Sequence, residues 1–214
     1  MTITVFGAKT SVGIHIVKMA LAKGYYVKAF DRNIEDLIDE DFRNDHLTAI
    51  KGYVFDKDEV HDAIKNSDAI ISCLGGSKDG TDKSRSLGMK NIIEGMLKAK
   101  VKRIVAISGI GILNYDESRL AIDDEEFPQE LKEVSFEHLA AYQHLKSTDL
   151  DWTLICPSTI DNKDFTGDYM IKENYLPNQN TEHVNAGDIA HYILKCISKN
   201  ESIRTRIGIS MKQI

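Results

Sequence analysis

The chain has 214 residues, and its 27 lysines and arginines against 33 aspartates and glutamates give a formal net charge of −6. This length suits one domain with a full hydrophobic core. The acidic balance provides no large basic surface for nucleic acid. We therefore expect a single domain that does not bind nucleic acid.

The three cysteines, Cys73, Cys156 and Cys196, are far apart, and each lies in an apolar run. Their spacing fits no metal site, and buried free thiols are typical of a reducing cytoplasm. The chain enters an apolar strand at once, without a signal peptide, and no apolar run approaches the length that spans a membrane. We expect a cytoplasmic protein with neither a metal ion nor a membrane partner.

Short β-branched runs alternate with segments of helical apolar spacing. The runs predict strands at 2–6, 26–30, 47–55, 68–74, 102–108 and 151–157, with a further strand at 204–210. The first helix follows residue 10 and ends at Lys23-Gly24, a basic last turn and a C-cap glycine. Further helices are predicted at 58–65, 84–100, 134–146 and 185–198. This alternation predicts an α/β fold, a doubly wound parallel sheet with helices on both faces.

Two stretches between these elements lack the periodicity. Residues 113–130 are acidic and indicate a solvated loop, with a lid over the substrate as the alternative. Residues 161–184 follow the sixth strand, at the edge where open α/β sheets bind ligands. We expect 109–130 and 157–184 to form the substrate side of the single domain 1–214.

The first strand is followed by VFGAKTSVG, a glycine-containing turn that opens a helix. In a dinucleotide fingerprint the outer glycines make the tight turn and the helix–strand contact, and the middle one lets the backbone approach the pyrophosphate. Thr10 stands in the middle place, where its side chain could crowd the diphosphate or its hydroxyl could donate to it. A turn with only a structural role is the alternative. The predicted phosphate contacts are Gly7, Lys9, Thr10, Ser11, Val12 and Gly13.

Asp31 and Arg32 stand at the end of the second strand. An acidic residue at this level binds the ribose hydroxyls and favours NAD, whereas an arginine pairs with a 2′-phosphate and favours NADP. Exposed charges at a strand end are the alternative interpretation. We therefore expect NAD(P)H as the cofactor, with the choice between NAD and NADP left open.

The turn VFGAKTSVG resembles the GATGxxG turn of the atypical short-chain dehydrogenase/reductases, an NAD(P)-binding family with a Rossmann-like, NmrA-like fold. The resemblance covers most of the chain. It implies that SDAIISCLGG is the strand whose end borders the cofactor's ribose, at Cys73, Leu74, Gly75 and Gly76. An ordinary glycine turn is the alternative for the last two residues. Relatives usually read LVRN where this chain reads FDRN, so Asp31 departs from their pattern.

The segment from His138 onwards is similar in spacing to the biliverdin-IXβ reductase/flavin reductase branch of that family. The matching positions are His138, Leu150, Trp152, Pro157 and FTGDY at 165–169. The resemblance implies hydride transfer from NAD(P)H to a flavin or another planar acceptor. Ser108 would bind the carboxamide or the substrate, and His138, with a pKa near the working pH, would orient the substrate or relay a proton. A helix-start histidine bound to nearby carbonyls is the alternative.

The same resemblance implies roles for residues that follow the sixth strand. Pro157 would border the cofactor, and Thr159, Phe165 and Tyr169 would line the substrate side. The two aromatic rings could form a wall for a planar molecule, with an ordinary surface role as the alternative.

Tyr142 and Lys146 have the Tyr-x-x-x-Lys spacing of the catalytic pair in typical short-chain dehydrogenases. A five-residue strand spans about 17 Å, which a helix covers in about eleven residues. Counting back from Trp152 brings the chain to the level of the cofactor near residues 136–140, so Lys146 lies toward the wrong end of the sheet. We interpret both as ordinary helix positions and place the catalytic role on Ser108 and His138.

The sequence therefore predicts an NAD(P)H-dependent oxidoreductase, a monomer or homodimer, that reduces a flavin or a similar planar acceptor. A non-catalytic, NmrA-like sensor of NAD(P) is the first alternative. An epimerase-like enzyme acting on a sugar nucleotide is the second, although 214 residues are few for the extra domain that such enzymes carry.

Overall fold

The computed structural model describes residues 1–37, 44–77, 79–177 and 183–212. Eight strands form one sheet in the order β3-β2-β1-β4-β5-β6-β10-β8. Neighbours are parallel except β10 and β8, which are antiparallel. Outward progression from β1 in both directions is the Rossmann-like doubly wound order and confirms the predicted α/β class. The strands are β1 (Thr2–Phe6), β2 (Tyr26–Asp31), β3 (Leu47–Lys51), β4 (Ala69–Ser72), β5 (Arg103–Ile107), β6 (Asp151–Pro157), β8 (Tyr169–Glu173) and β10 (Thr205–Met211).

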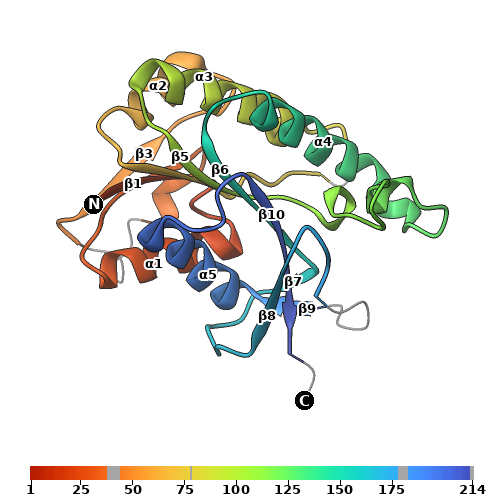
Figure 1. The fold of residues 1–214 in the computed structure, drawn as a ribbon. Helices are drawn as coiled ribbons and strands as arrows, with labels where there is room; N and C mark the ends of the chain where they lie inside the picture. Colours follow the sequence, from red (N-terminus) through yellow and green to blue (C-terminus); the bar gives the residue numbers. More distant parts are fainter. Residues whose placement is uncertain (38–43, 78, 178–182, 213–214) are drawn as a thin grey trace.

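Helices cover both faces of this sheet (Figure 1). On one face α1 packs beside α5, and on the other α2 packs beside α3 and α3 beside α4. Each layer closes its own hydrophobic core, represented by Ile16 in one and Ile64 in the other. Successive strand side chains alternate between the faces, so Val5 enters the first core and Phe6 the second. The helices are α1 (Ser11–Ala22), α2 (Lys57–Ile64), α3 (Met89–Ala99), α4 (Gln129–Lys146) and α5 (Ala186–Lys199).

Helix α1 begins and ends as the sequence predicts. Thr10 is its N-cap, and Lys23 is its C-cap. Gly24 follows with φ of +75°, a left-handed conformation that glycine adopts without strain. The position of α1 directly after β1 places its amino terminus at the carboxyl edge of the sheet.

Three predicted boundaries are wrong. The strand expected at 47–55 ends at Lys51. Gly52, the next residue, packs so close to the Phe30 ring that a Cβ would lie 2.4 Å from it. The helix expected at 84–100 is a π-helical turn, η3 (Ser84–Gly88), continued by α3. The helix expected at 134–146 already begins at Gln129, directly after Pro128.

The segment 109–130 is more than a solvated loop. It contains two short 3₁₀ turns, η4 (Ile110–Ile112) and η5 (Ala121–Asp123), and buries Leu113 and Phe127. The Arg206 guanidinium, on β10, donates to the Ile112 carbonyl and to Oδ1 of Asn114. Apolar burial and these bonds therefore fix the segment against the sheet.

The segment 157–184 contains strands that the sequence analysis did not predict. β7 (Thr159–Asp161) pairs in parallel with β9 (His183–Asn185), and β8 extends the main sheet along β10. None of the helices in the described part of the chain is long and apolar enough to cross a membrane.

Candidate cofactor and active site

The turn between β1 and α1 has the close packing that a dinucleotide turn requires. Gly7 has φ of +73°, and a Cβ there would lie 2.6 Å from the carbonyl oxygen of Cys73. A Cβ at Gly13 would lie 2.3 Å from the carbonyl oxygen of Gly7. Both positions thus require glycine. The amides of Ser11 and Val12 belong to the first turn of α1, which an α-helix leaves without internal acceptors and which suits an anionic diphosphate.

Thr10 occupies the middle place with its hydroxyl folded into the turn. Its Oγ1 donates to the carbonyl oxygen of Gly7 over 2.9 Å and accepts from the amide of Gly13 over 3.1 Å. The hydroxyl proton is therefore used inside the turn, and the interpretation in which it is donated to the diphosphate is wrong for this conformation. Thr10 caps α1 and borders the cofactor cavity.

Asp31 ties this turn to the end of β2. Its Oδ2 accepts from the amide of Lys9 over 3.2 Å, and its Oδ1 accepts from the amide of Asn33 over 3.1 Å. Each carboxylate oxygen has lone pairs for a further donor, so these bonds leave capacity for ribose hydroxyls. Arg32 follows as an exposed side chain at the same cavity.

A cavity of about 320 Å³ lies at the carboxyl ends of β1, β2 and β4. Its size and position suit the adenosine half of a dinucleotide. The sequence analysis missed the lining residues that come from the misassigned end of strand 47–55 and from η3. Predicted residues in the lining are Gly7, Lys9, Thr10, Asp31, Arg32, Leu74, Gly75 and Gly76, and missed ones are Phe30, Asn33, Gly52, Tyr53, Val54 and Ser84.

The glycines after β4 differ in their surroundings. A Cβ at Gly75 would meet no atom of the described residues within 4 Å, so the backbone there borders open space. A Cβ at Gly76 would lie 2.4 Å from Oδ2 of Asp82. Open space beside Gly75 and close-packed glycines at the α1 turn show that the residues present fit a dinucleotide.

Other predicted cofactor residues are buried and do not line this cavity. Cys73 is buried, and burial raises the pKa of its thiol. Pro157 ends β6, buried, opposite Ile209 of β10. Val12 and Gly13 are buried in α1. We infer that these buried residues support the cofactor site by packing and do not contact the cofactor with their side chains.

Ser108 and His138, the two predicted catalytic residues, are in contact. Oγ of Ser108, just after β5, lies 3.3 Å from Nδ1 of His138 on α4. Gly109 makes room for the imidazole, since a Cβ there would lie 2.8 Å from its Cδ2. The Ser108 amide donates to the carbonyl oxygen of Ile155 over 2.7 Å. The pair is therefore fixed at the carboxyl edge of the sheet, on the same edge as the cofactor cavity.

The charge state of His138 differs from the expectation. Burial, with a smaller contribution from the nearby Arg85 cation, lowers the pKa of His138 from 6.5 to about 3. The expected pKa near the working pH is therefore wrong, and the imidazole is neutral at neutral pH. It can orient a ligand or the Ser108 hydroxyl, but it does not act as an imidazolium acid.

Tyr142 and Lys146 occupy the positions that the helix geometry assigned to them. The Tyr142 ring packs edge-on against Trp152, which lies near the start of β6, with centroids 5.7 Å apart. Nζ of Lys146 lies 5.7 Å from the centroid of the Tyr142 ring. Since Ser108 follows the opposite, carboxyl end of β5, Tyr142 and Lys146 belong to the packing of α4.

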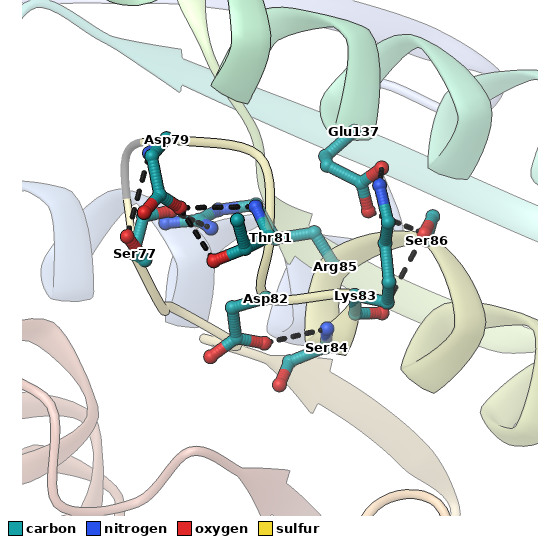
Figure 2. Close-up of polar contacts among 9 residues, drawn as sticks. All are labelled: Ser77, Asp79, Thr81, Asp82, Lys83, Ser84, Arg85, Ser86 and Glu137. Atoms are coloured by element: carbon teal, nitrogen blue, oxygen red, sulfur yellow. Dashed lines mark hydrogen bonds and ion pairs between the residues drawn. The ribbon is translucent and has the colours of Figure 1, made fainter.

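The chain after β4 is tied to α4 at Glu137, as Figure 2 shows. Glu137 accepts from Nζ of Lys83 over 2.7 Å and from the Ser86 hydroxyl. These bonds keep the pKa of the Glu137 carboxyl low in spite of its burial. Arg85 donates to the carbonyl oxygens of Gly76 and Ser77. The wall of the cofactor cavity and the helix that carries His138 are thus held together by polar contacts.

The predicted substrate-side aromatics pack on α5. The His191 ring lies 4.4 Å from that of Phe165, centroid to centroid, and its Nδ1 lies 2.9 Å from the Tyr169 hydroxyl. Phe165 remains partly exposed. Thr159 is exposed on β7. The structure does not bring these residues into the cavity described above.

Asp188, which the sequence analysis missed, holds the segment FTGDY in place. It is fully buried and accepts from the amides of Thr166 and Gly167 over 3.0 and 2.8 Å, and from the Thr166 hydroxyl over 2.9 Å. Nδ2 of Asn185 donates to it over 3.1 Å. The only sequence signal was an acidic residue in the first turn of a predicted helix.

The model of the NAD(P)H-binding family matches residues 7–200 of this chain. The chain belongs to that family. The human sterol-4-alpha-carboxylate 3-dehydrogenase is 23% identical over 138 residues, which are 62% of this chain and 35% of the human one. The chain thus spans about a third of that relative's length.

Two solved structures share the whole fold of this NAD(P)H-binding protein. A proposed epimerase from Bacteroides thetaiotaomicron is 25% identical, with a TM-score of 0.86 over 100% of this chain and 98% of that one. A proposed NADH-flavin reductase from Streptococcus pneumoniae is 22% identical, with a TM-score of 0.84 over 99% and 100%. The predicted NAD(P)H cofactor and the resemblance to atypical short-chain dehydrogenase/reductases are confirmed at the level of the family.

Proposed function

We propose that this chain reduces a flavin or a similar planar acceptor by hydride transfer from NAD(P)H. The observation that carries the proposal is the Ser108–His138 contact of 3.3 Å at the carboxyl edge of the sheet, the edge that also holds the cofactor cavity. Tyr142 and Lys146 do not accompany it, because the Tyr142 ring packs against Trp152 near the start of β6. The site has a hydroxyl and a neutral imidazole but no strong acid. Such a site suits an acceptor that can be reduced without a proton donated by the protein. The Streptococcus pneumoniae neighbour, a proposed NADH-flavin reductase, has the same fold.

In this mechanism the bound nicotinamide supplies the hydride. The residues of the chain bind the cofactor, orient the acceptor and shield the reacting atoms from water. The amides of Ser11 and Val12 hold the diphosphate, and Gly75 lets the ribose approach the backbone. Ser108 donates its hydroxyl to the carboxamide or the acceptor while Nδ1 of His138 holds that hydroxyl in place. Because the pKa of His138 is about 3, the proton that completes the reduction comes from solvent.

The direct test is the loss of NADH or NADPH absorbance with FMN, FAD or riboflavin as the acceptor. The native protein should turn over, and Ser108→Ala should lose about tenfold or more in kcat/KM while it still binds the cofactor. Ser198→Ala is the matched control, because Ser198 is exposed on α5 and donates only to its own helix, at Lys195. Turnover that is equal in Ser108→Ala and in the native protein would refute the role of Ser108.

A non-catalytic NAD(P) sensor is the second candidate. It is favoured by the burial of His138, which leaves the site without a group that titrates near neutral pH. The sensor predicts a rise in Tm with NADH or NADPH and no oxidation of either nucleotide by any flavin. Turnover with a flavin would exclude it.

The proposal also covers the cellular location, the acceptor side of the domain and the oligomeric state. The three free, buried cysteines support a cytoplasmic protein. Segments 109–130 and 157–184 form the acceptor side, and the protein acts as a monomer or homodimer on a small molecule. Sedimentation of the purified protein decides between these two states.

A further inference from the structure

Arg85 contacts the wall of the cofactor cavity at Gly76 and acts electrostatically on His138. It belongs to η3, and its Nη1 and Nη2 donate to the carbonyl oxygens of Ser77 and Gly76 over 3.1 and 3.0 Å. Gly76 lines the cofactor cavity. On its other side the Arg85 charge is close enough to His138 to contribute to the lowered pKa of that imidazole.

The positive charge of Arg85 has no close counter-ion. Within the described residues, no carboxylate oxygen forms an ion pair with it inside 4 Å, and Asp82 and Glu137 are the acidic groups whose charges reach it. Glu137 already holds Lys83 and Ser86, and Asp82 accepts from the Ser84 amide over 2.8 Å. Partial burial outweighs both acids and lowers the pKa of Arg85. A cation in this situation gains from an anionic partner.

The guanidinium also retains donors. It carries more N–H groups than the two carbonyl oxygens use, in a planar fork that matches carboxylate and phosphate oxygens. The carbonyl bonds hold it in one orientation, which reduces the entropy lost when an anion binds. His138 is neutral at neutral pH and is within electrostatic reach of Arg85, so Arg85 supplies positive charge on this side of the site.

We propose that Arg85 binds an anionic group of the acceptor, a phosphate or a carboxylate, while the planar part of the acceptor lies at the Ser108–His138 pair. This inference rests on the proposed reduction of a planar acceptor and narrows its substrate class. It predicts that among acceptors with the same ring system, those with an anionic side chain are preferred.

FMN and riboflavin provide the test, because they share the isoalloxazine ring and differ by one phosphate. The native protein should show kcat/KM at least about tenfold higher for FMN, and tighter FMN binding by quenching of flavin fluorescence in the presence of saturating NADP⁺. Arg85→Gln keeps donors for the carbonyl oxygens but removes the charge, so the preference should fall to about twofold or less. Arg85→Lys keeps the charge and should retain most of the preference. Lys90→Gln, an exposed charge on α3, is the control and should retain all of it.

Several results would overturn the inference. The first is equal affinities and rates for the two flavins in the native protein. The second is an unchanged FMN preference in Arg85→Gln. The third is an equal loss of the FMN preference in Arg85→Gln and Arg85→Lys, because this would assign the effect to loop geometry rather than to the charge. A weaker affinity for NADPH with the flavin ratio intact would assign Arg85 to the cofactor and would also overturn it. If neither flavin is reduced, the proposed reductase function fails, and the fluorescence titrations still decide whether Arg85 binds the phosphate.

Discussion

The carboxylate of Asp31 accepts a hydrogen bond from the backbone amide of Lys9 over 3.2 Å, so the end of β2 holds the turn that follows β1. Asp31 therefore has two tasks in this account. It orders the phosphate turn, and it presents negative charge where the adenosine ribose binds. An asparagine in its place removes the charge, and its single oxygen still accepts one of the two backbone hydrogen bonds.

Asp31→Asn should raise the affinity for NADPH relative to NADH by about tenfold, since the repulsion of a 2′-phosphate disappears while Arg32 remains. Calorimetric titration of both nucleotides measures the ratio. Asp58→Asn, which removes an exposed charge from the first turn of α2, is the control and should leave it unchanged. An unchanged ratio in Asp31→Asn would show that Asp31 does not face the ribose.

Thr10→Val should lower the free energy of unfolding by about 1 kcal/mol, because valine cannot accept from the amide of Gly13. For a chain of this size the Tm should fall by about 2–4 °C. Thr10→Ser, which keeps the hydroxyl, should stay close to the native Tm. Equal Tm values for Thr10→Val and Thr10→Ser would contradict the capping role.

His138 should make the protein less stable in mild acid. Its pKa is about 3 in the folded state against an ordinary value of 6.5. The unfolded chain therefore takes up the proton first, and stability falls as the pH drops below 6.5, by up to about 1.4 kcal/mol per pH unit. Urea denaturation of the native protein and of His138→Gln at a series of pH values should show a shallower acid loss in the variant. His144→Gln on the same helix is the control, and parallel curves for native and His138→Gln would contradict the buried neutral state.

Tyr142→Phe and Lys146→Met should leave kcat/KM for a flavin within about twofold of the native value. The reason is that the Tyr142 ring packs on Trp152, near the start of β6, and Nζ of Lys146 lies 5.7 Å from the centroid of the Tyr142 ring, whereas Ser108 follows the opposite end of β5. Steady-state kinetics measures this, with Tm as the check on folding. A loss of about tenfold or more at native stability would restore the tyrosine–lysine mechanism.

Asp188→Ala should destabilise the protein by about 2 kcal/mol or more, because it removes a buried acceptor and leaves the donors of Thr166, Gly167 and Asn185 without their partner. Chemical denaturation measures the loss, and limited proteolysis should cut near 164–168 first. Asp168→Ala, an exposed neighbour, should change little. If both variants are equally stable, Asp188 does not anchor this segment.

The sequence predicted the parts of the site that local rules control. Gly7 and Gly13 are required by close backbone contacts within one turn, and the rise of a helix relative to a strand placed His138 at the level of Ser108. These relationships depend on short stretches of chain and regular geometry. The same reasoning assigned Tyr142 to the packing of its helix, and the ring packs against Trp152.

Other features depend on contacts between distant segments. Gly52 follows β3 against the Phe30 ring, which leaves no room for a side chain, and no local pattern shows this. The low pKa of His138 arises from burial under the folded chain. The buried acceptor for FTGDY is Asp188, a residue about 20 positions further along, which only the folded structure brings near. In 109–130 the acidic residues interrupt the apolar ones, so the sequence shows no pattern that would predict the burial of this segment.

The central claim is tested most directly by the electron density of a crystal of this protein with NADP⁺ or NAD⁺. The account predicts the diphosphate within hydrogen-bond distance of the Ser11 and Val12 amides and the nicotinamide ring against the Ser108–His138 pair. A dinucleotide bound elsewhere, or a turn closed by the Thr10 side chain in a protein saturated with nucleotide, would contradict it.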